Sequence, residues 1–303
     1  MHERPSSATL YPVRRAVVAT LLGLMATVAL SCAAPRQKLG VVYDDRTPEQ
    51  TLMDVRMPAA DGKLHPGIVF VHGGGWLYGN RDHHDTIALR FAQGGYVTAT
   101  VEYRLGADGR YPKAVQDVGC ALSHFRAHAA EYDLDPQRVA IFGYSAGGHL
   151  ASLVGVAGQH PLHVPDCAAG GTYAPRAVIA GAPPIDFRGR DNPVFRSFLG
   201  GSEDEHPDRY QTASPITHVR PGLPPFLFLH GSSDILVSSD ESLSMQAQLR
   251  ATGNQAELMQ VAGGGHLTSA GSGLTDQQWL SAEKTPEAWL AMLDFLERTV
   301  GAP

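Results

Sequence analysis

The 303-residue sequence lacks the features that mark several classes of protein. Positive charge is scarce: Lys and Arg number 24 against 30 Asp and Glu, the net charge is −6, and no basic stretch suits nucleic acid. Neither G-K-[ST] nor G-x-G-x-x-G occurs, so no phosphate-binding loop is indicated. The chain also has no internal repeat and no low-complexity tract. We therefore expect no nucleic-acid partner and no cofactor.

Cysteine is scarce too, and its three positions bear on where the protein resides. Arg14 and Arg15 precede a fifteen-residue apolar run that ends in small residues, which is typical of a secretory signal peptide over residues 1–31. A retained membrane anchor is the alternative. Ser31 and Cys32 also resemble a bacterial lipobox, in which Cys32 would be lipidated and become the mature N-terminus. We expect an exported protein, periplasmic or extracellular, with a lipid anchor if Cys32 is modified.

The remaining cysteines, Cys120 and Cys167, form an even pair in an exported chain. Oxidising compartments favour disulfides, so we predict a Cys120–Cys167 bridge. The alternative is two separate buried thiols, because free cysteine is often a small core residue.

Beyond residue 40, short β-rich runs alternate with longer stretches of helical spacing. Apolar runs such as GIVFVHG and PFLFLHG indicate central strands covered by helices on both faces. This alternation predicts one α/β domain over residues 40–303, with a mostly parallel sheet flanked by helices. The segment Pro183–Pro225, rich in Pro, Gly, Asp and Arg, is either a small cap or an ordinary surface connection.

The first chemical signal is G-Y-S-A-G, from Gly143 to Gly147, between an apolar strand and an alanine-rich helix. The chain turns sharply there, and glycines on either side of Ser145 relieve the crowding. The pattern predicts that Ser145 is a nucleophile exposed at a helix N-terminus.

The second signal is HGGGW, which follows another apolar strand upstream. Consecutive glycines let backbone N–H groups approach a ligand, so we expect two such donors, together with the N–H of Ala146, to hold the negative oxygen of a tetrahedral intermediate. Trp76 and Tyr144 border the site and are candidate substrate-binding residues. Packing against neighbouring loops is the alternative for both rings.

A nucleophile needs a base and an acid. His266 follows the last strand on a glycine-rich loop and is the candidate base, and Asp234 at the end of the preceding strand is the candidate acid. Asp186 competes with it, because it too follows an apolar strand, while Asp240 lies farther on. Trp279 is a weaker candidate for the rim.

The other histidines have simpler interpretations, and we predict no metal site. His72 orients the glycine loop, and the RDHHD stretch is a polar helix start. His124 and His128 lie one helical turn apart, but no acidic third ligand accompanies them.

Together these motifs resemble the α/β-hydrolase superfamily. The segment from EYRLGADGRYPK to FGYSAGGHLASL is similar in sequence to carboxylesterases of the hormone-sensitive-lipase-like and bacterial feruloyl and acetyl esterase groups. The resemblance implies an eight-stranded, mostly parallel sheet with a reversed second strand and no metal. It also implies oxyanion donors at Gly74, Gly75 and Ala146, with Gly73 as a further candidate. No long N-terminal helical cap remains after the signal peptide, which argues against a lipase with a bulky lid.

We therefore expect a serine carboxylesterase acting on short-chain acyl or aryl esters, as a monomer or small homo-oligomer. Its partner would be a small-molecule ester. An amide or formamide hydrolase and a serine peptidase are alternative enzymes of the same fold. A binding protein of this fold without catalytic activity is an alternative of a different class.

Overall fold

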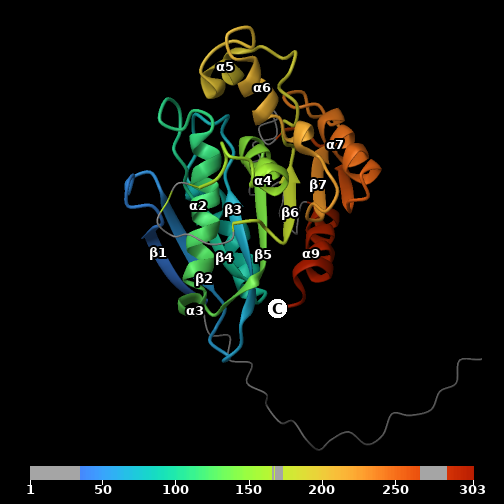
Figure 1. The fold of residues 1–303 in the computed structure, drawn as a ribbon. Coiled ribbons are helices and arrows are strands. Elements are labelled where there is room, and N and C mark those ends of the chain that lie inside the picture. The colour runs from blue at the N-terminus through green and yellow to red at the C-terminus, as the bar shows by residue number, and fades with distance from the viewer. Residues whose placement is uncertain (1–34, 166, 168–172, 267–284) are drawn as a thin grey trace, which may run out of the picture. The chain divides into compact units, whose positions relative to one another are not determined.

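The computed structural model describes residues 35–165, 167, 173–266 and 285–303. Its centre is an eight-stranded sheet in the order β1-β2-β4-β3-β5-β6-β7-β8 (Figure 1). The strands are β1 (Arg36–Val42), β2 (Leu52–Met57), β3 (His65–Val71), β4 (Val97–Val101), β5 (Leu134–Tyr144), β6 (Ala177–Gly181), β7 (Phe226–Gly231) and β8 (Ala256–Val261). Strand β2 is antiparallel to both of its neighbours, and the strands from β4 to β8 are parallel. The expected mostly parallel sheet with a reversed second strand is confirmed.

Strand β1 corrects the domain boundary expected at residue 40. It pairs with β2 from Arg36 opposite Met57, so the folded domain begins earlier. The strand was missed because it lies at the edge of the sheet and its residues are almost all exposed. An exposed edge strand needs no apolar face, so its sequence shows no periodicity for pattern reading to detect.

Helices cover both faces of the sheet, which explains the apolar central strands. The helical segments are η1 (Arg81–His84), α1 (Asp85–Gln93), α2 (Lys113–Ala127), α3 (Ala129–Tyr132), α4 (Ala146–Ala157), α5 (Pro193–Leu199), α6 (Pro207–Ala213), η2 (Pro215–His218), α7 (Asp240–Ala251) and α9 (Pro286–Val300). Helices α2, α4 and α7 share one core with the sheet, and α1 and α9 share the other. Along β3, Ile68 and Phe70 face the second core while Val69 and Val71 face the first.

The segment Pro183–Pro225 forms a small cap of two short helices. Helices α5 and α6 lie beyond the carboxyl ends of the parallel strands (Figure 1). Hydrogen bonds that join the cap to the body include one from Tyr111 N to Phe198 O, at 2.9 Å, and one from a ring nitrogen of His149 to Ala213 O, at 2.8 Å. The cap therefore stands at the edge of the sheet where the candidate catalytic residues end their strands.

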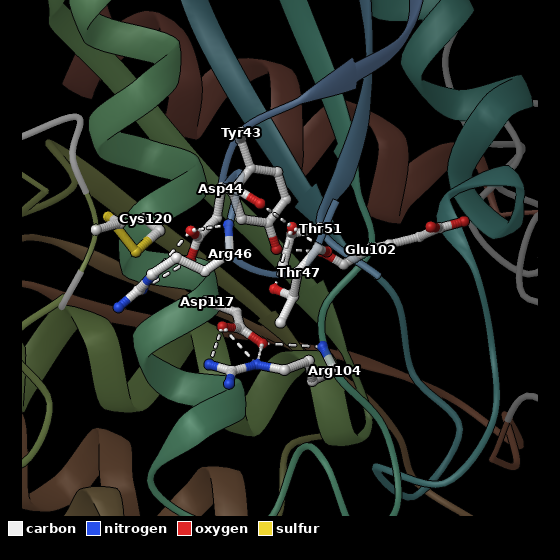
Figure 2. The surroundings of a disulfide bond; sticks show 10 residues. Tyr43, Asp44, Arg46, Thr47, Thr51, Glu102, Arg104, Asp117 and Cys120 are labelled. Carbon is white, nitrogen blue, oxygen red and sulfur yellow. Dashed lines mark hydrogen bonds and ion pairs between the residues drawn. A yellow bond between two sulfur atoms is a disulfide. The ribbon is translucent and has the colours of Figure 1, made fainter. Parts of the chain in front are cut away.

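The structure joins Cys120 of α2 to Cys167, with the two Cα atoms 6.0 Å apart. Asp117 lies three residues before Cys120 on α2, is buried, and accepts hydrogen bonds from Arg104 at both carboxylate oxygens (Figure 2). The bridge thus ties α2 to the segment that follows α4.

Two N-terminal expectations and one C-terminal expectation lie outside the described residues. These are the signal peptide over residues 1–31, the lipidation of Cys32 and the rim position of Trp279. Within the described ranges, no helix is long and apolar enough to cross a membrane.

Candidate active site

Ser145 occupies a sharp turn between β5 and α4, and its backbone is strained. Its φ of 53° and ψ of −120° lie in a region that side-chain-bearing residues rarely adopt, at a cost of about 1–3 kcal/mol. A Cβ on Gly143 would lie 2.1 Å from Gly147 O, and one on Gly147 would lie 2.1 Å from Val71 O. Both glycines of the motif are therefore sterically required. The Ser145 N–H is fixed by donation to Gly181 O at 2.8 Å.

The structure brings Ser145, His266 and Asp234 into one hydrogen-bonded line. His266 Nε2 lies 2.9 Å from Ser145 Oγ, and His266 Nδ1 lies 2.6 Å from Asp234 Oδ2. Because an ionised carboxylate only accepts, Nδ1 carries the imidazole proton and Nε2 presents its lone pair to the serine hydroxyl. This is the tautomer that a general base requires.

Asp234 is held as a charged carboxylate by its surroundings. Its side chain is fully buried, and Oδ1 accepts hydrogen bonds from the N–H groups of Leu236 and Val237, each at 2.9 Å. Burial alone would raise the pKa of this carboxyl. The hydrogen bonds from His230, His266 and Val237 outweigh burial and hold the pKa well below its usual range.

The carboxylate of Asp186, the competing candidate for the acid, is bound to an arginine and not to His266. Its carboxylate accepts from Arg188 Nε at 2.9 Å and Nη2 at 2.8 Å. Its backbone N–H donates to Glu241 Oε2, which also accepts from Ile185 N, while Glu241 Oε1 forms an ion pair with Arg190. Glu241 thereby ties the chain after β6 to α7. Sequence reasoning missed this role, because a glutamate in a first helical turn has the appearance of a solvated helix start.

The glycine loop after β3 lies directly against the nucleophile. A Cβ on Gly73 would lie 3.3 Å from Ser145 Cβ, and Gly74 and Gly75 have φ values of 109° and 61°. Among the described turns and loops, neither the Gly74 nor the Gly75 N–H donates to a backbone acceptor, and Ala146 is the first residue of α4, whose N–H has no partner within the helix. These three N–H groups thus have no backbone acceptor in the described turns, loops and helix α4.

His72 is a structural residue in this arrangement. Its ring stacks on Tyr103 with centroids 4.3 Å apart, and its Nδ1–H donates to Gly73 O at 2.7 Å. Burial lowers the pKa of His72 to about 4, so the ring is neutral at pH 7. A neutral ring bonded to the glycine loop matches the orienting role expected for it.

Trp76 and Tyr144 lie next to the site but are buried. Trp76 stacks on Phe198 of the cap with centroids 4.5 Å apart and meets Phe187 edge-on. The Tyr144 ring lies 5.5 Å from the His266 ring and has no exposed surface. Burial of both rings favours the packing role over direct contact with a substrate.

The described residues contain one convergent acidic group, formed by Asp54, Asp82 and Asp85. Arg81 pairs with Asp54 at 3.0 Å, and Arg56 pairs with Asp85 at 2.8 Å. Two of the three carboxylates are therefore paired with guanidinium groups. The cluster is therefore explained as an ion-pair network beside η1, apart from the triad.

Comparison with known proteins identifies the family. The family model named BD-FAE matches residues 53–249. Esterase LipC of Mycobacterium tuberculosis is 31% identical over 236 residues, which is 75% of this chain and 58% of LipC. Among solved structures, the apo form of Thermogutta terrifontis esterase 2 has a TM-score of 0.70 at 27% identity, covering 89% of this chain and 97% of that protein.

A truncated carbohydrate esterase from gut microbiota has a TM-score of 0.74 at 23% identity, covers 88% of this chain and 96% of its own, and supports the fold alone. The chain spans a little over half the length of the curated relatives: 58% of LipC and 51% of Esterase LipQ from the same species. The BD-FAE match covers well over half of the chain. The chain belongs to the BD-FAE family and has the α/β-hydrolase fold.

Proposed function

We propose that the protein is a serine carboxylesterase that hydrolyses short-chain acyl or aryl esters. The observation that carries this proposal is the line from Ser145 Oγ through both nitrogens of His266 to Asp234 Oδ2. The N–H groups of Gly74 and Gly75, on the glycine loop that approaches Ser145, donate to no backbone acceptor among the described turns and loops, which supports an oxyanion hole. Several relatives and structural neighbours are named esterases or carboxylic ester hydrolases, which supports ester hydrolysis.

In the proposed reaction, Ser145 Oγ attacks the ester carbonyl carbon while its proton passes to His266 Nε2. The carbonyl oxygen becomes an oxyanion and accepts hydrogen bonds from the N–H groups of Gly74, Gly75 and Ala146. One such donor is worth about 3 kcal/mol in the transition state. His266 then gives its proton to the leaving alkoxide, and an alcohol departs.

Water completes the cycle. His266 takes a proton from water as the hydroxide oxygen attacks the acyl carbon. The acyl–Oγ bond then breaks, the proton returns to Ser145, and the carboxylic acid leaves. Asp234 keeps its charge throughout and stabilises the imidazolium that forms twice in the cycle.

The preference for small acyl or aryl groups is the finer part of the proposal. Aromatic rings of the cap fill the space around Trp76, where Phe187, Phe195 and Phe198 all pack against its indole. Val194 of α5 would lie 3.4 Å from a Cβ placed on Gly75. A cap this close to the oxyanion loop supports a compact site.

Export remains part of the proposal, with a signal peptide over residues 1–31 and lipidation at Cys32. Metabolic labelling with a fatty acid tests it: Cys32→Ser should abolish labelling. Unchanged labelling would refute the lipid anchor. We also propose that the protein acts as a monomer or small homo-oligomer, which sedimentation can test.

The central experiment compares p-nitrophenyl esters of increasing acyl length with a matched p-nitroanilide, together with covalent modification by paraoxon. We expect rapid turnover of short esters and one phosphoryl adduct on Ser145 by mass spectrometry, both lost in Ser145→Ala. Faster anilide turnover would favour the amide hydrolase. If the protein shows no turnover and forms no adduct, the non-catalytic binding protein is favoured. Activity that survives Ser145→Ala would overturn the mechanism.

A further inference from the structure

One buried histidine near the triad has no part in the proposed reaction. His230 lies one residue before the end of β7, four residues before Asp234 in the chain, and its side chain has no exposed surface. An imidazole shut away from water needs hydrogen-bond partners, because an unpaired ring nitrogen costs free energy. The partners of His230 therefore show what holds this ring and what the ring holds in turn.

The Nε2 atom of His230 faces the turn that carries the candidate acid. It lies 2.9 Å from Val237 O and 3.4 Å from Asp234 Oδ2. A carbonyl oxygen and an ionised carboxylate oxygen only accept hydrogen bonds, so the ring proton of His230 is on Nε2. The nearer oxygen takes the stronger bond, and the carboxylate lies at the edge of hydrogen-bond distance. One N–H thus approaches both the turn and the catalytic carboxylate.

The Nδ1 atom of His230 has its partner on another element. It lies 2.7 Å from Ser242 Oγ, in the first turn of α7, and this serine is also buried. Because Nε2 holds the proton of the neutral ring, Nδ1 accepts from the serine hydroxyl. The hydrogen bond at one imidazole nitrogen sets which nitrogen carries the proton. Ser242 therefore keeps the His230 N–H directed at the turn.

His230 and His266 approach the same oxygen of Asp234. Oδ2 accepts from His266 Nδ1 at 2.6 Å, while Oδ1 accepts from Val237 N at 2.9 Å. Val237 is thus bonded twice, with its N–H on the carboxylate and its C=O on His230. Burial raises the pKa of the Asp234 carboxyl, and His230 is foremost among the groups that lower it. His230 therefore acts on both carboxylate oxygens, directly on Oδ2 and through Val237 on Oδ1.

We propose that His230 is a positioning residue of the triad, which holds the Asp234 carboxylate in the orientation that His266 needs. This role rests on the proposed function, because it concerns the same triad. Without the His230 N–H, the turn would lose the bond at Val237 O, and the carboxylate could rotate away from the imidazole. The imidazolium that forms in the reaction would then be less well stabilised. Because His230 touches neither substrate nor reacting atoms, its loss should lower kcat and leave KM little changed.

Steady-state kinetics of His230→Leu and His230→Gln on p-nitrophenyl acetate test this role. Leucine removes the N–H, and we expect kcat to fall about 10- to 100-fold, the range for a hydrogen bond to a charged group. Glutamine keeps an N–H near the place of Nε2 and should recover most of the loss. Equal kcat in wild type and His230→Leu, or equal losses in the two variants, would overturn the proposal.

A double-mutant cycle separates an action through Asp234 from a general effect on the fold. In Asp234→Asn the amide nitrogen replaces Oδ2 and cannot accept from His230. Adding His230→Leu to that variant should therefore lower kcat by no more than about threefold, whereas independent effects would add. A second loss as large as the first would contradict the positioning role.

The matched control is His65→Leu. His65 is also a buried imidazole, bonded to Asp61 at 3.0 Å, but it is the first residue of β3 and so lies at the opposite edge of the sheet from the triad. Its replacement should lower the Tm and leave kcat unchanged. If kcat falls as far as in His230→Leu, the loss of any buried imidazole suffices and His230 has no special role.

Proton NMR reads the same contact without catalysis. The His266 Nδ1–H, in its 2.6 Å bond to Asp234, should give a far-downfield resonance that is absent in Asp234→Asn, present in His230→Gln and lost in His230→Leu. If the wild type hydrolyses no ester, the proposed function fails, and an identical resonance in wild type and His230→Leu would still refute the positioning role. If His230→Leu does not fold, Ser242→Ala takes its place, and an unchanged kcat and resonance there would be the refuting result.

Discussion

Replacing Asp234 with asparagine should abolish catalysis by reversing the direction of one hydrogen bond. Oδ1 accepts from two backbone donors, Leu236 N and Val237 N, so the amide oxygen must occupy that position. The amide nitrogen then takes the place of Oδ2, 2.6 Å from His266 Nδ1. Because the amide nitrogen donates, Nδ1 must accept, and the imidazole proton moves to Nε2. The ring then points a proton at Ser145 Oγ and cannot act as a base.

The size of this effect follows from the role of the carboxylate. A triad held in the wrong tautomer loses about 10⁴ in kcat, which corresponds to about 5.4 kcal/mol of transition-state stabilisation. The substitution preserves the shape and the two backbone hydrogen bonds, so the fold and the substrate site should persist. We therefore expect kcat to fall about 10⁴-fold with KM little changed.

Steady-state kinetics on p-nitrophenyl acetate, with the Tm measured on the same samples, provides the assay. Asp186→Asn is the matched control, because this carboxylate bonds Arg188 near the surface and a surface ion pair is worth at most about 1 kcal/mol. It should leave kcat/KM unchanged. If Asp234→Asn keeps more than a tenth of the activity, or if Asp186→Asn proves to be the inactive variant, the assignment of the acid is wrong.

Three further predictions concern stability and the turn at the nucleophile. The Cys120–Cys167 bridge closes a loop with a separation of 47 residues, so replacing both cysteines with alanine should cost about 4 kcal/mol and lower the Tm by about 7 °C in calorimetry; an unchanged Tm would show that the bridge is absent. Three buried histidines have a pKa lowered by burial, to about 4 for His72 and about 3 for His84 and His149, so the unfolded chain binds more protons below pH 6.5. Stability should therefore fall as the pH drops from 7 to 5, by about 2 kcal/mol for each ring, and urea midpoints that stay constant over this range would contradict it. Gly143→Ala places a Cβ 2.1 Å from a backbone oxygen, so we expect little soluble, active protein, whereas Gly155→Ala, which meets only side-chain atoms, should be milder in the same expression and activity tests.

The parts of the fold that could be read from the sequence are those in which burial leaves a pattern. The apolar runs of β3 and β7 are buried at every residue, so they stand out against the helical spacing around them. The turn that holds the nucleophile could also be predicted from the sequence, because only glycine fits near Ser145 at positions 143 and 147. Steric exclusion narrows the choice of residue, and such positions carry the most information.

Other features depend on contacts between distant segments and leave no local trace. Glu241, for example, joins α7 to the chain after β6. Trp76 follows the oxyanion glycines, yet its ring is buried under Phe198 of the cap. Its position in the sequence indicated proximity to the site correctly but could not tell whether the ring faced a substrate or a neighbouring side chain.

The order of the triad along the chain becomes a spatial arrangement because the sheet is parallel where it matters. Strands β5, β6, β7 and β8 are neighbours in both sequence and space, and parallel strands end at the same edge. Ser145 follows β5, Asp234 follows β7 and His266 follows β8, so their side chains meet above one edge. Asp186 follows β6, which lies between them, yet its carboxylate is paired with Arg188. A strand end brings a residue to the edge, and the local turn decides whether it faces the imidazole.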